Sequence, residues 1–304
     1  MHALEIHQLR KVYSNGVEAL KGIDLTVKDG DFFALLGANG AGKSTTIGLI
    51  TTLLTKTSGS IRILGKDLHE SPELAKSYLG LVPQEVNLNI FESCEQILIN
   101  QAGYYGITRT IAKKRALELL EQLGLWDKRK DIVRHLSGGM KRRLMIARAL
   151  IHQPKVLILD EPTAGVDIEI RRSMWEFLTS TNKAGTTIIL TTHYLEEAEQ
   201  LCKNIAIIDR GTIVVNTSMK NLLKTLRHQT FVFNTVNPIT ELPTIEPFIA
   251  TLIDCYTFEL RVDNKWSLNE VFEVLTQHGL SVHSMRNKTN RLEELFLDLI
   301  SHGD

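Results

Sequence analysis

A glycine-rich segment of eight residues constrains the fold of this chain more than any other feature. It reads Gly37-Ala38-Asn39-Gly40-Ala41-Gly42-Lys43-Ser44, follows the continuous apolar run Phe32–Leu36 and precedes a helical pattern. A G-x-x-x-x-G-K-[ST] loop between a buried strand and a helix turns backbone N–H groups around a phosphate, and the helix dipole adds to the attraction. We therefore predict a nucleotide-phosphate site, in which Lys43 reaches the β- and γ-phosphates and Ser44 holds Mg²⁺.

The apolar pattern predicts an α/β fold. The runs Val156–Leu159 and Thr187–Thr191 are continuous, which suits parallel strands buried on both faces of a sheet. Residues 4–36 alternate between apolar and polar positions, which is typical of antiparallel strands, and residues 205–215 indicate a closing hairpin. Helical faces within residues 116–151 predict a mostly helical insert.

The pattern changes after about residue 219, in a chain of 304 residues that is long enough for two hydrophobic cores. Three prolines in one short interval argue against regular helix there: Pro238, Pro243 and Pro247. An alternating strand over 256–262 and a helix with the capping box Ser267 to Glu270 follow. A last strand and a last helix end the chain, the helix including Leu292, Leu295, Phe296 and Leu299. We predict two domains, residues 1–219 with a helical subdomain at about 86–150, and a small α+β domain at 220–304.

Two acidic residues, Asp160 and Glu161, end the apolar run that begins at Val156. Ligands of open parallel sheets bind beside the carboxyl ends of the strands. Beside a phosphate loop, we expect Asp160 to orient Mg²⁺ or its waters and Glu161 to accept a proton from the attacking water. Taken alone, the two residues are better explained as solvated acids, because many strands end in one.

The segment Leu136-Ser137-Gly138-Gly139-Met140 predicts a second anion-binding helix end. Ser137 suits an N-cap, and the two glycines leave N–H groups accessible at the start of the helix that follows. An ordinary helix cap would have the same residues, but it does not explain their place shortly before the strand-end acids.

With these motifs in place, the sequence resembles the ATP-binding cassette (ABC) ATPases, the motor subunits of ABC transporters, over residues 1 to about 215. Besides the phosphate loop and the strand-end acids, the matching positions are Gln84, Leu136–Gly139, Asp167 and His193, which occur in the family's order. Tyr13 stands where the family has an aromatic residue that stacks on adenine. The resemblance implies a P-loop NTPase with a RecA-like parallel-sheet core, an N-terminal antiparallel β-subdomain and an inserted helical subdomain.

The resemblance also implies a role for each matched residue. ATP would be the substrate, with Mg²⁺ held by Ser44, Gln84 and Asp160. Gln84 and His193 would act with Glu161 at the γ-phosphate. Residues 137–139 would bind the γ-phosphate of ATP held by the opposite subunit of a homodimer that encloses two ATP molecules. The ATP-binding residues would be Tyr13, Gly37, Ala38, Asn39, Gly40, Ala41, Gly42, Lys43, Ser44 and Thr45; the residues acting across the dimer would be Ser137, Gly138 and Gly139, with Asp167 at its seam.

Two positions depart from the usual pattern of the family. Met140 stands where Gln is common, and Ala164-Gly165-Val166-Asp167 stands where Ser-Ala-Leu-Asp is usual. Neither change removes Ser137 or the backbone of Gly139, so the phosphate-binding atoms are kept, while the detailed geometry of the shared site is open.

ATP hydrolysis coupled to transport, and to export in particular, is the leading functional hypothesis. No apolar run approaches the ~18 residues that span a bilayer. The resemblance therefore implies a separate polytopic membrane permease and a peripheral location at the cytoplasmic face of the cytoplasmic membrane. The segment Arg291–Phe296 is similar to the tails of exporter ATPases of the drug and type-two efflux class.

The main alternative is a soluble ABC ATPase that acts on nucleic acid or ribosomes. The chain has 35 Lys+Arg and 35 Asp+Glu, whereas nucleic-acid binding usually needs a basic excess. We interpret the basic residues on the helix that follows Ser137 as a solvated face: Lys141, Arg142, Arg143 and Arg148. A GTPase is disfavoured because no Asn-Lys-x-Asp motif is present. We expect no structural metal, and we expect unpaired thiols, because Cys94, Cys202 and Cys255 lack C-x-x-C spacing.

Overall fold

The computed structural model describes residues 1–226, 228–288, 292–293 and 295. The chain divides into two compact units, Met1–Thr217 and Ser218–Asp304. Each unit has its own apolar cluster, which includes Phe33 and Ile158 in the first unit and Phe233 and Leu275 in the second. Most of the predicted last helix lies outside the described residues.

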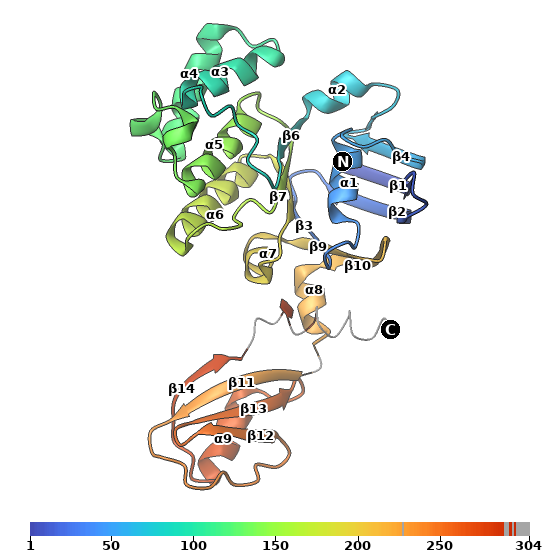
Figure 1. Ribbon diagram of the computed structural model, residues 1–304. Helices are drawn as coiled ribbons and strands as arrows, with labels where there is room; N and C mark the ends of the chain where they lie inside the picture. Colours follow the sequence, from blue (N-terminus) through green and yellow to red (C-terminus); the bar gives the residue numbers. More distant parts are fainter. Residues whose placement is uncertain (227, 289–291, 294, 296–304) are drawn as a thin grey trace. The chain divides into compact units, whose positions relative to one another are not determined.

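The first unit is built around a six-stranded sheet with the order β10-β9-β3-β8-β7-β6 (Figure 1). Its strands are β3 (Phe32–Leu36), β6 (Leu79–Val82), β7 (Val156–Asp160), β8 (Thr187–Thr191), β9 (Asn204–Asp209) and β10 (Thr212–Ser218). The strands from β9 to β6 pair in parallel, and β3 and β8 are buried at every position. The prediction of a buried parallel sheet is therefore confirmed. Strand β6 was not predicted, because four residues are too few for a periodic pattern.

A second sheet of the first unit is antiparallel and has the order β2-β1-β4-β5. Its strands are β1 (His2–Val12), β2 (Glu18–Lys28), β4 (Ser58–Ile63) and β5 (Lys66–Asp67). In β2 the apolar residues Ile23, Leu25 and Val27 are buried and alternate with exposed polar residues. This one-sided burial is what the alternating sequence pattern predicts.

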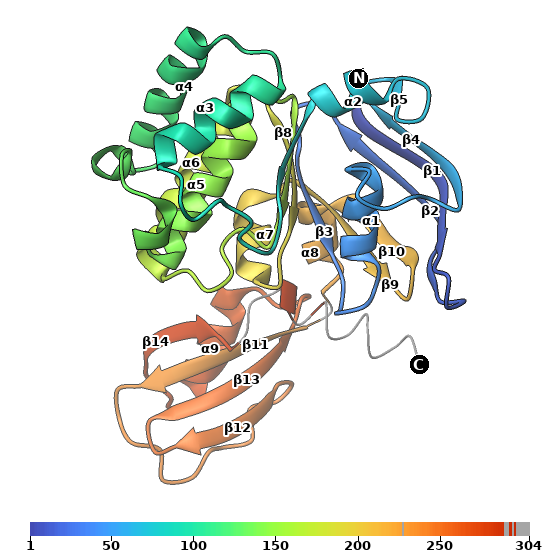
Figure 2. The ribbon, with the colours of Figure 1, turned by 45° about the horizontal axis from the view of Figure 1, so that its top comes forward.

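Helices cover the parallel sheet on both sides. Those that follow or precede its strands are α1 (Lys43–Ile50), α2 (Pro72–Ser77), α6 (Ile168–Lys183) and α7 (Leu195–Leu201). The predicted insert contains α3 (Cys94–Tyr104), α4 (Arg109–Gln122), η1 (Trp126–Lys128), η2 (Val133–His135) and α5 (Gly138–Leu150). Figures 1 and 2 show α3, α4 and α5 gathered together on the opposite side of the sheet from α1.

The second unit is α+β. Its antiparallel sheet has the order β12-β13-β11-β14. Its elements are α8 (Met219–Lys224), β11 (His228–Thr235), β12 (Ile249–Asp254), β13 (Thr257–Asp263), α9 (Leu268–Gln277) and β14 (Val282–Asn287). The predicted capping box opens α9, with Ser267 N donating to the Glu270 carboxylate at 2.7 Å. Residues 236–248 contain neither helix nor strand, as their three prolines predict.

Candidate active site

The phosphate loop joins the buried strand β3 to helix α1. Gly42 is the N-cap of α1 with φ 118°, a backbone conformation that glycine adopts without strain. No side chain caps this helix, and no acidic residue lies in its first turn. The N–H groups at the start of α1 are therefore left for an anionic ligand.

Lys43 folds back over this loop. Its Nζ donates to the carbonyl oxygens of Gly37 at 2.7 Å and Ala38 at 3.0 Å. Burial lowers the pKa of Lys43, against the opposing effect of the Glu161 and Asp160 carboxylates. Both carboxylates therefore stabilise the charged form of Lys43 against the effect of burial.

Asp160 is the last residue of β7 and is partly buried. Its Oδ1 accepts a hydrogen bond of 2.5 Å from the hydroxyl of Thr191, at the end of the neighbouring strand β8. Burial and the charge of the neighbouring Glu161 raise the pKa of Asp160, while the Thr191 hydrogen bond, Lys43 and Arg142 lower it. The carboxylate is therefore held at a strand end with cationic groups nearby.

Glu161 meets two residues that are distant in the sequence. Its Oε2 accepts from Gln84 Nε2 at 3.0 Å and lies 3.2 Å from His193 Nδ1. The backbone of Glu161 has φ 48°, which is unusual for a residue other than glycine, and its N–H donates to Thr191 O at 3.0 Å. This bend directs the side chain toward the Gln84 and His193 side chains, so the three residues form one cluster.

Gln84 follows β6, and helix α5 fixes the segment around it. Arg142 Nη1 donates to Pro83 O at 3.3 Å, and Arg148 Nη1 donates to Asn87 O at 3.0 Å. Arg143 Nη1 donates to Leu123 O at 2.8 Å. The prediction of a solvated basic face is therefore wrong for these three arginines, because their guanidinium groups satisfy backbone carbonyls of neighbouring segments.

The segment Ser137–Gly139 begins α5. The Ser137 hydroxyl accepts from Met140 N at 3.3 Å, a cap that depends on the backbone of residue 140 and not on its side chain. A Cβ at Gly139 would lie 3.1 Å from Ile170 of α6, so this segment contacts α6 of its own chain. A Cβ at Gly138 would meet no atom within 4 Å, which leaves this position open.

Asp167 lies at the start of α6, beside the same segment. It is the N-cap of α6, and its Oδ1 accepts from Ile170 N at 3.0 Å. Its charge also acts on Arg143 of α5. The structure thus brings Asp167 near the start of α5, whereas Glu161, Gln84 and His193 form a separate group.

Tyr13 lies beside helix α1. Its hydroxyl is 3.2 Å from the Thr45 hydroxyl, and the Lys11 ammonium lies over its ring at 5.1 Å from the ring centre. The ring is thus held next to the first turn of the phosphate-loop helix.

The residues assigned to Mg²⁺ fit that ion by chemistry. Ser44, Asp160 and Gln84 offer oxygen ligands, which Mg²⁺ prefers. Gln84 directs its amide nitrogen at Glu161, so its amide oxygen is the atom left for a metal. Among the described residues, no group of three or more His, Cys, Asp and Glu side chains could hold a metal ion.

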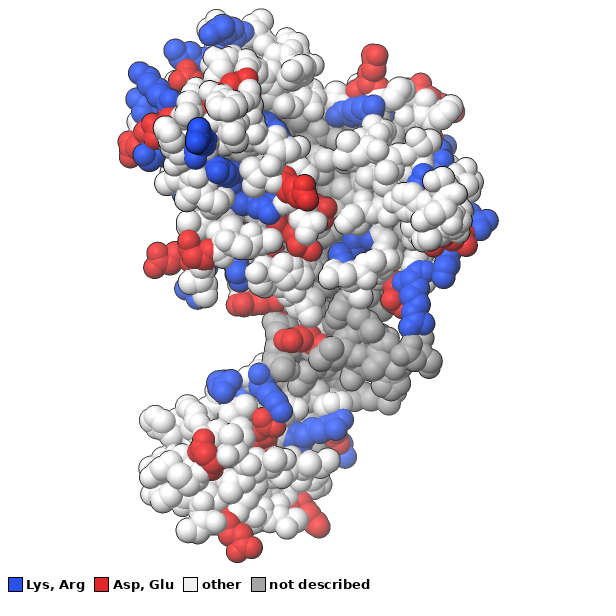
Figure 3. All heavy atoms as spheres, in the orientation of Figure 1, with Lys and Arg blue, Asp and Glu red and all other residues white. Residues whose placement is uncertain are grey.

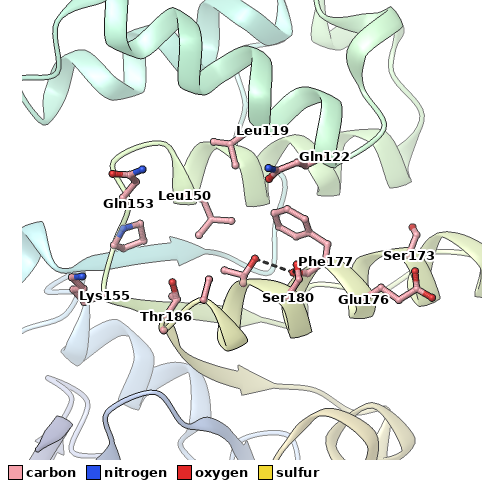
Figure 4. Close-up of a pocket in the computed structure, with 14 residues that line it drawn as sticks. Leu119, Gln122, Leu150, Gln153, Lys155, Ser173, Glu176, Phe177, Ser180 and Thr186 are labelled. Atoms are coloured by element: carbon pink, nitrogen blue, oxygen red, sulfur yellow. Dashed lines mark hydrogen bonds between the residues drawn. The ribbon is translucent and has the colours of Figure 1, made fainter.

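A cavity of about 960 Å³ lies away from these residues, between α4, α5 and α6 (Figure 4). Leu119, Leu150 and Phe177 project into it, with polar residues such as Gln122 and Ser180 around them. It includes none of the predicted site residues. The phosphate loop presents backbone groups on an open surface, so the nucleotide site is recognised by its motif and not by the size of a cavity.

Residues 20–164 match the family model of the ABC transporter. The linearmycin resistance ATP-binding protein of Bacillus subtilis is 37% identical over 97% of both chains, and the daunorubicin/doxorubicin resistance ATP-binding protein of Streptomyces peucetius is 33% identical over 99% of this chain and 93% of its own. The Nod factor export ATP-binding protein of Cupriavidus pinatubonensis is 41% identical over 72% of this chain and 67% of its own.

Solved structures of ATP-binding cassettes indicate the same family. An ATP-binding subunit of an ABC transporter superposes with a TM-score of 0.68 at 30% identity, covering 73% of this chain and 92% of its own. An ATP-binding cassette dimer in a post-hydrolysis state, bound to ADP and phosphate, superposes with a TM-score of 0.66 at 26% identity, covering 71% of this chain and 98% of its own. Within the described residues, no helix is both long and apolar enough to cross a membrane. The chain belongs to the ABC transporter family, as one of its ATP-binding, ATP-hydrolysing subunits.

Proposed function

We propose that this subunit hydrolyses ATP at the cluster of Gln84, Glu161 and His193 and thereby energises export through a separate membrane permease. One observation carries the proposal: the Glu161 carboxylate is held between Gln84 and His193 while its charge also reaches Lys43 of the phosphate loop. A proton acceptor and a phosphate-binding lysine are thus placed in one site.

Each side chain has a distinct part in this proposal. Gln84 and His193 both contact Oε2 of Glu161, which leaves Oε1 to accept a proton from the attacking water. Lys43 exchanges its carbonyl partners for the β- and γ-phosphates, a favourable exchange because burial has already removed much of its hydration. When bound by Ser44, Asp160 and Gln84, Mg²⁺ supplies positive charge to the phosphate oxygens.

We also propose that the working form is a homodimer that encloses two ATP molecules. Ser137–Gly139 opens a helix of 13 residues, and the space around Gly138 is open, which suits contact with the γ-phosphate of ATP on a second subunit. Asp167, next to this segment, then lies at the dimer seam. Tyr13 stacks on the adenine of the ATP bound at the phosphate loop.

The export function and its partner rest on the relatives, two of which are named for drug resistance and one for Nod factor export. The segment that follows Gln84 exposes Val86, Ile90 and Phe91, the last to 71%. Such an apolar surface next to the Gln84 segment suits contact with a permease, which would place the subunit at the cytoplasmic face of the membrane. Met1–Thr217 is the cassette in this proposal, and Ser218–Asp304 is an accessory domain.

The nucleic-acid alternative gains no support, because the relatives described above are named for drug resistance and Nod factor export. On the face drawn in Figure 3, acidic and basic side chains are mixed, consistent with a net charge of zero.

Glu161→Gln tests the catalytic assignment. It keeps the shape of the side chain and removes the proton acceptor, so ATP turnover should fall by about 10²–10⁴-fold while ATP binding and ATP-dependent dimerisation persist. Glu196→Gln, at an exposed carboxylate on α7, is the matched control and should keep normal turnover. Normal turnover in Glu161→Gln would show that another group is the base. Recovery of a polytopic membrane protein with the tagged chain from detergent extracts tests the partner, and recovery of ribosomes instead would contradict it.

A further inference from the structure

One buried carboxylate in the first unit, Glu197 of α7, has no role in the chemistry described above. Its side chain is fully buried, with an exposed fraction of 0%. An acidic residue is rarely buried to this extent unless its oxygens meet donors. One of its donors comes from the loop that follows Glu161, and Glu197 itself lies on the helix that follows His193.

Two donors converge on one oxygen of this carboxylate. Thr163 Oγ1 donates to Glu197 Oε1 at 3.1 Å, and Trp175 Nε1 donates to the same oxygen at 2.8 Å. Thr163 lies two residues after Glu161, and Trp175 lies on α6, the helix that Asp167 caps. Glu197 therefore joins the loop after β7 to α6.

The segment that carries His193 leads directly into the helix of the same carboxylate, because α7 begins at Leu195. Burial raises the pKa of Glu197, while the Thr192 hydroxyl, the hydrogen bonds from Trp175 and Thr163 and the charge of Arg171 lower it. Thr192 directly precedes His193, and its hydroxyl also accepts from Tyr194 N at 3.0 Å. The acid thus has a hydrogen-bond partner beside Glu161 and lies on the helix that follows His193.

Arg171 of α6 completes the surroundings of Glu197. Its guanidinium lies over the Tyr194 ring at 4.2 Å, and that ring lies 4.0 Å from the His193 ring. Within the described residues, Glu197 Oε2 has no hydrogen-bond partner. The hydrogen bonds to the carboxylate are therefore concentrated in Oε1.

We propose that Glu197 is a positioning residue for ATP hydrolysis: from the helix that follows His193 it binds Thr163 of the loop after Glu161 and Trp175 of α6, and so sets the 3.2 Å contact between Glu161 and His193. The inference rests on the proposed function, because it assumes that this contact takes part in turnover. Glu197 touches neither ATP nor the attacking water in this scheme. It acts by holding two loops at a fixed separation.

The test compares two substitutions in the full-length chain. Glu197→Ala removes the acceptor, so kcat should fall about 10- to 100-fold through misplacement of the reacting groups, with the Kd for ATP within about threefold of normal. Glu197→Gln keeps an acceptor oxygen at the Oε1 position and puts its amide nitrogen at Oε2, where no hydrogen bond is lost. It should restore kcat to within about fivefold of normal.

Two further measurements separate positioning from a purely structural effect. In a His193→Ala background, Glu197→Ala should change kcat by less than about threefold, because residues that act as a unit are not additive. Asn182→Ala is the control for loss of a buried polar side chain on α6 that makes several hydrogen bonds. Asn182 donates to Gly30 O, Asp31 O and Thr186 O. It should lower the melting temperature and leave kcat per folded molecule unchanged.

Each outcome bears on one claim. Normal kcat in Glu197→Ala would overturn the positioning role. So would equal losses of kcat in Glu197→Ala and Glu197→Gln, if those losses followed the fall in melting temperature. Full additivity with His193→Ala would also overturn it. Normal turnover in Glu161→Gln would instead overturn the proposed function, whatever the result at Glu197.

Discussion

Replacing Gly37 by alanine should weaken ATP binding for a steric reason that the structure makes explicit. A Cβ at Gly37 would lie 2.3 Å from Ile208 O and 2.9 Å from Ile208 Cγ2. An ordinary C···O contact is about 3.3 Å, so one side must move by about 1 Å. Ile208 lies in β9 and is fully buried, whereas Asn39 and Gly40 of the loop are exposed. The loop is therefore the side that moves.

The size of the effect follows from the energy of overpacking. Inserting a methyl group into a filled space costs about 1–3 kcal/mol. If displacement of the loop releases that strain, ATP binding must restore the native loop and loses the same energy, which weakens affinity by about 5- to 150-fold. Isothermal titration of Gly37→Ala with ATP measures this loss directly.

Gly65→Ala is the matched control outside the phosphate loop. A Cβ there meets no atom within 4 Å, but φ is +75°, so the cost is backbone strain of about 1 kcal/mol. Free and bound forms share that strain, so ATP affinity should change by less than about fivefold. The reasoning is refuted if Gly37→Ala binds ATP within about twofold of normal while its melting temperature falls, since strand β9 would then have absorbed the clash.

Two further predictions concern the inserted helices and the thiols. Arg148→Met removes two hydrogen bonds from α5 to Asn87, and it should lower the free energy of unfolding by about 1–3 kcal/mol in chemical denaturation; an unchanged midpoint would contradict this. Cys255 is exposed and should react quickly with a maleimide at neutral pH, whereas Cys94 and Cys202 are buried, and burial raises the pKa of Cys94 to about 11 and that of Cys202 well above its usual value. Mass spectrometry of the native protein should show label on Cys255 alone, and equal labelling of Cys94 would show that its site is open.

The sequence could predict those parts of the protein whose backbone conformation depends on residues adjacent in the chain. The phosphate loop, the acids that end β7 and the Ser137 helix start are short contiguous segments, and their backbone conformation follows from glycines, caps and apolar runs. The buried parallel strands were recognised for the same reason, because burial on both faces requires an unbroken apolar run.

The tertiary structure alone decided which distant residues meet. The strand order β3-β8-β7-β6 places the ends of β6, β7 and β8 side by side, and so brings Gln84 and His193 to Glu161. A sequence pattern records periodicity and not strand order, so it could suggest these residues only through the family resemblance.

The same limit explains the arginines of α5 and the carboxylate of Glu197. In the sequence, charged residues between apolar ones predict solvent exposure. In the structure, backbone carbonyls of neighbouring loops bind Arg142 and Arg148, and donors from two separate segments bind Glu197. Whether a charge is buried depends on partners that only the folded chain assembles, so the sequence determined the phosphate-binding chemistry and the fold determined how its residues are held.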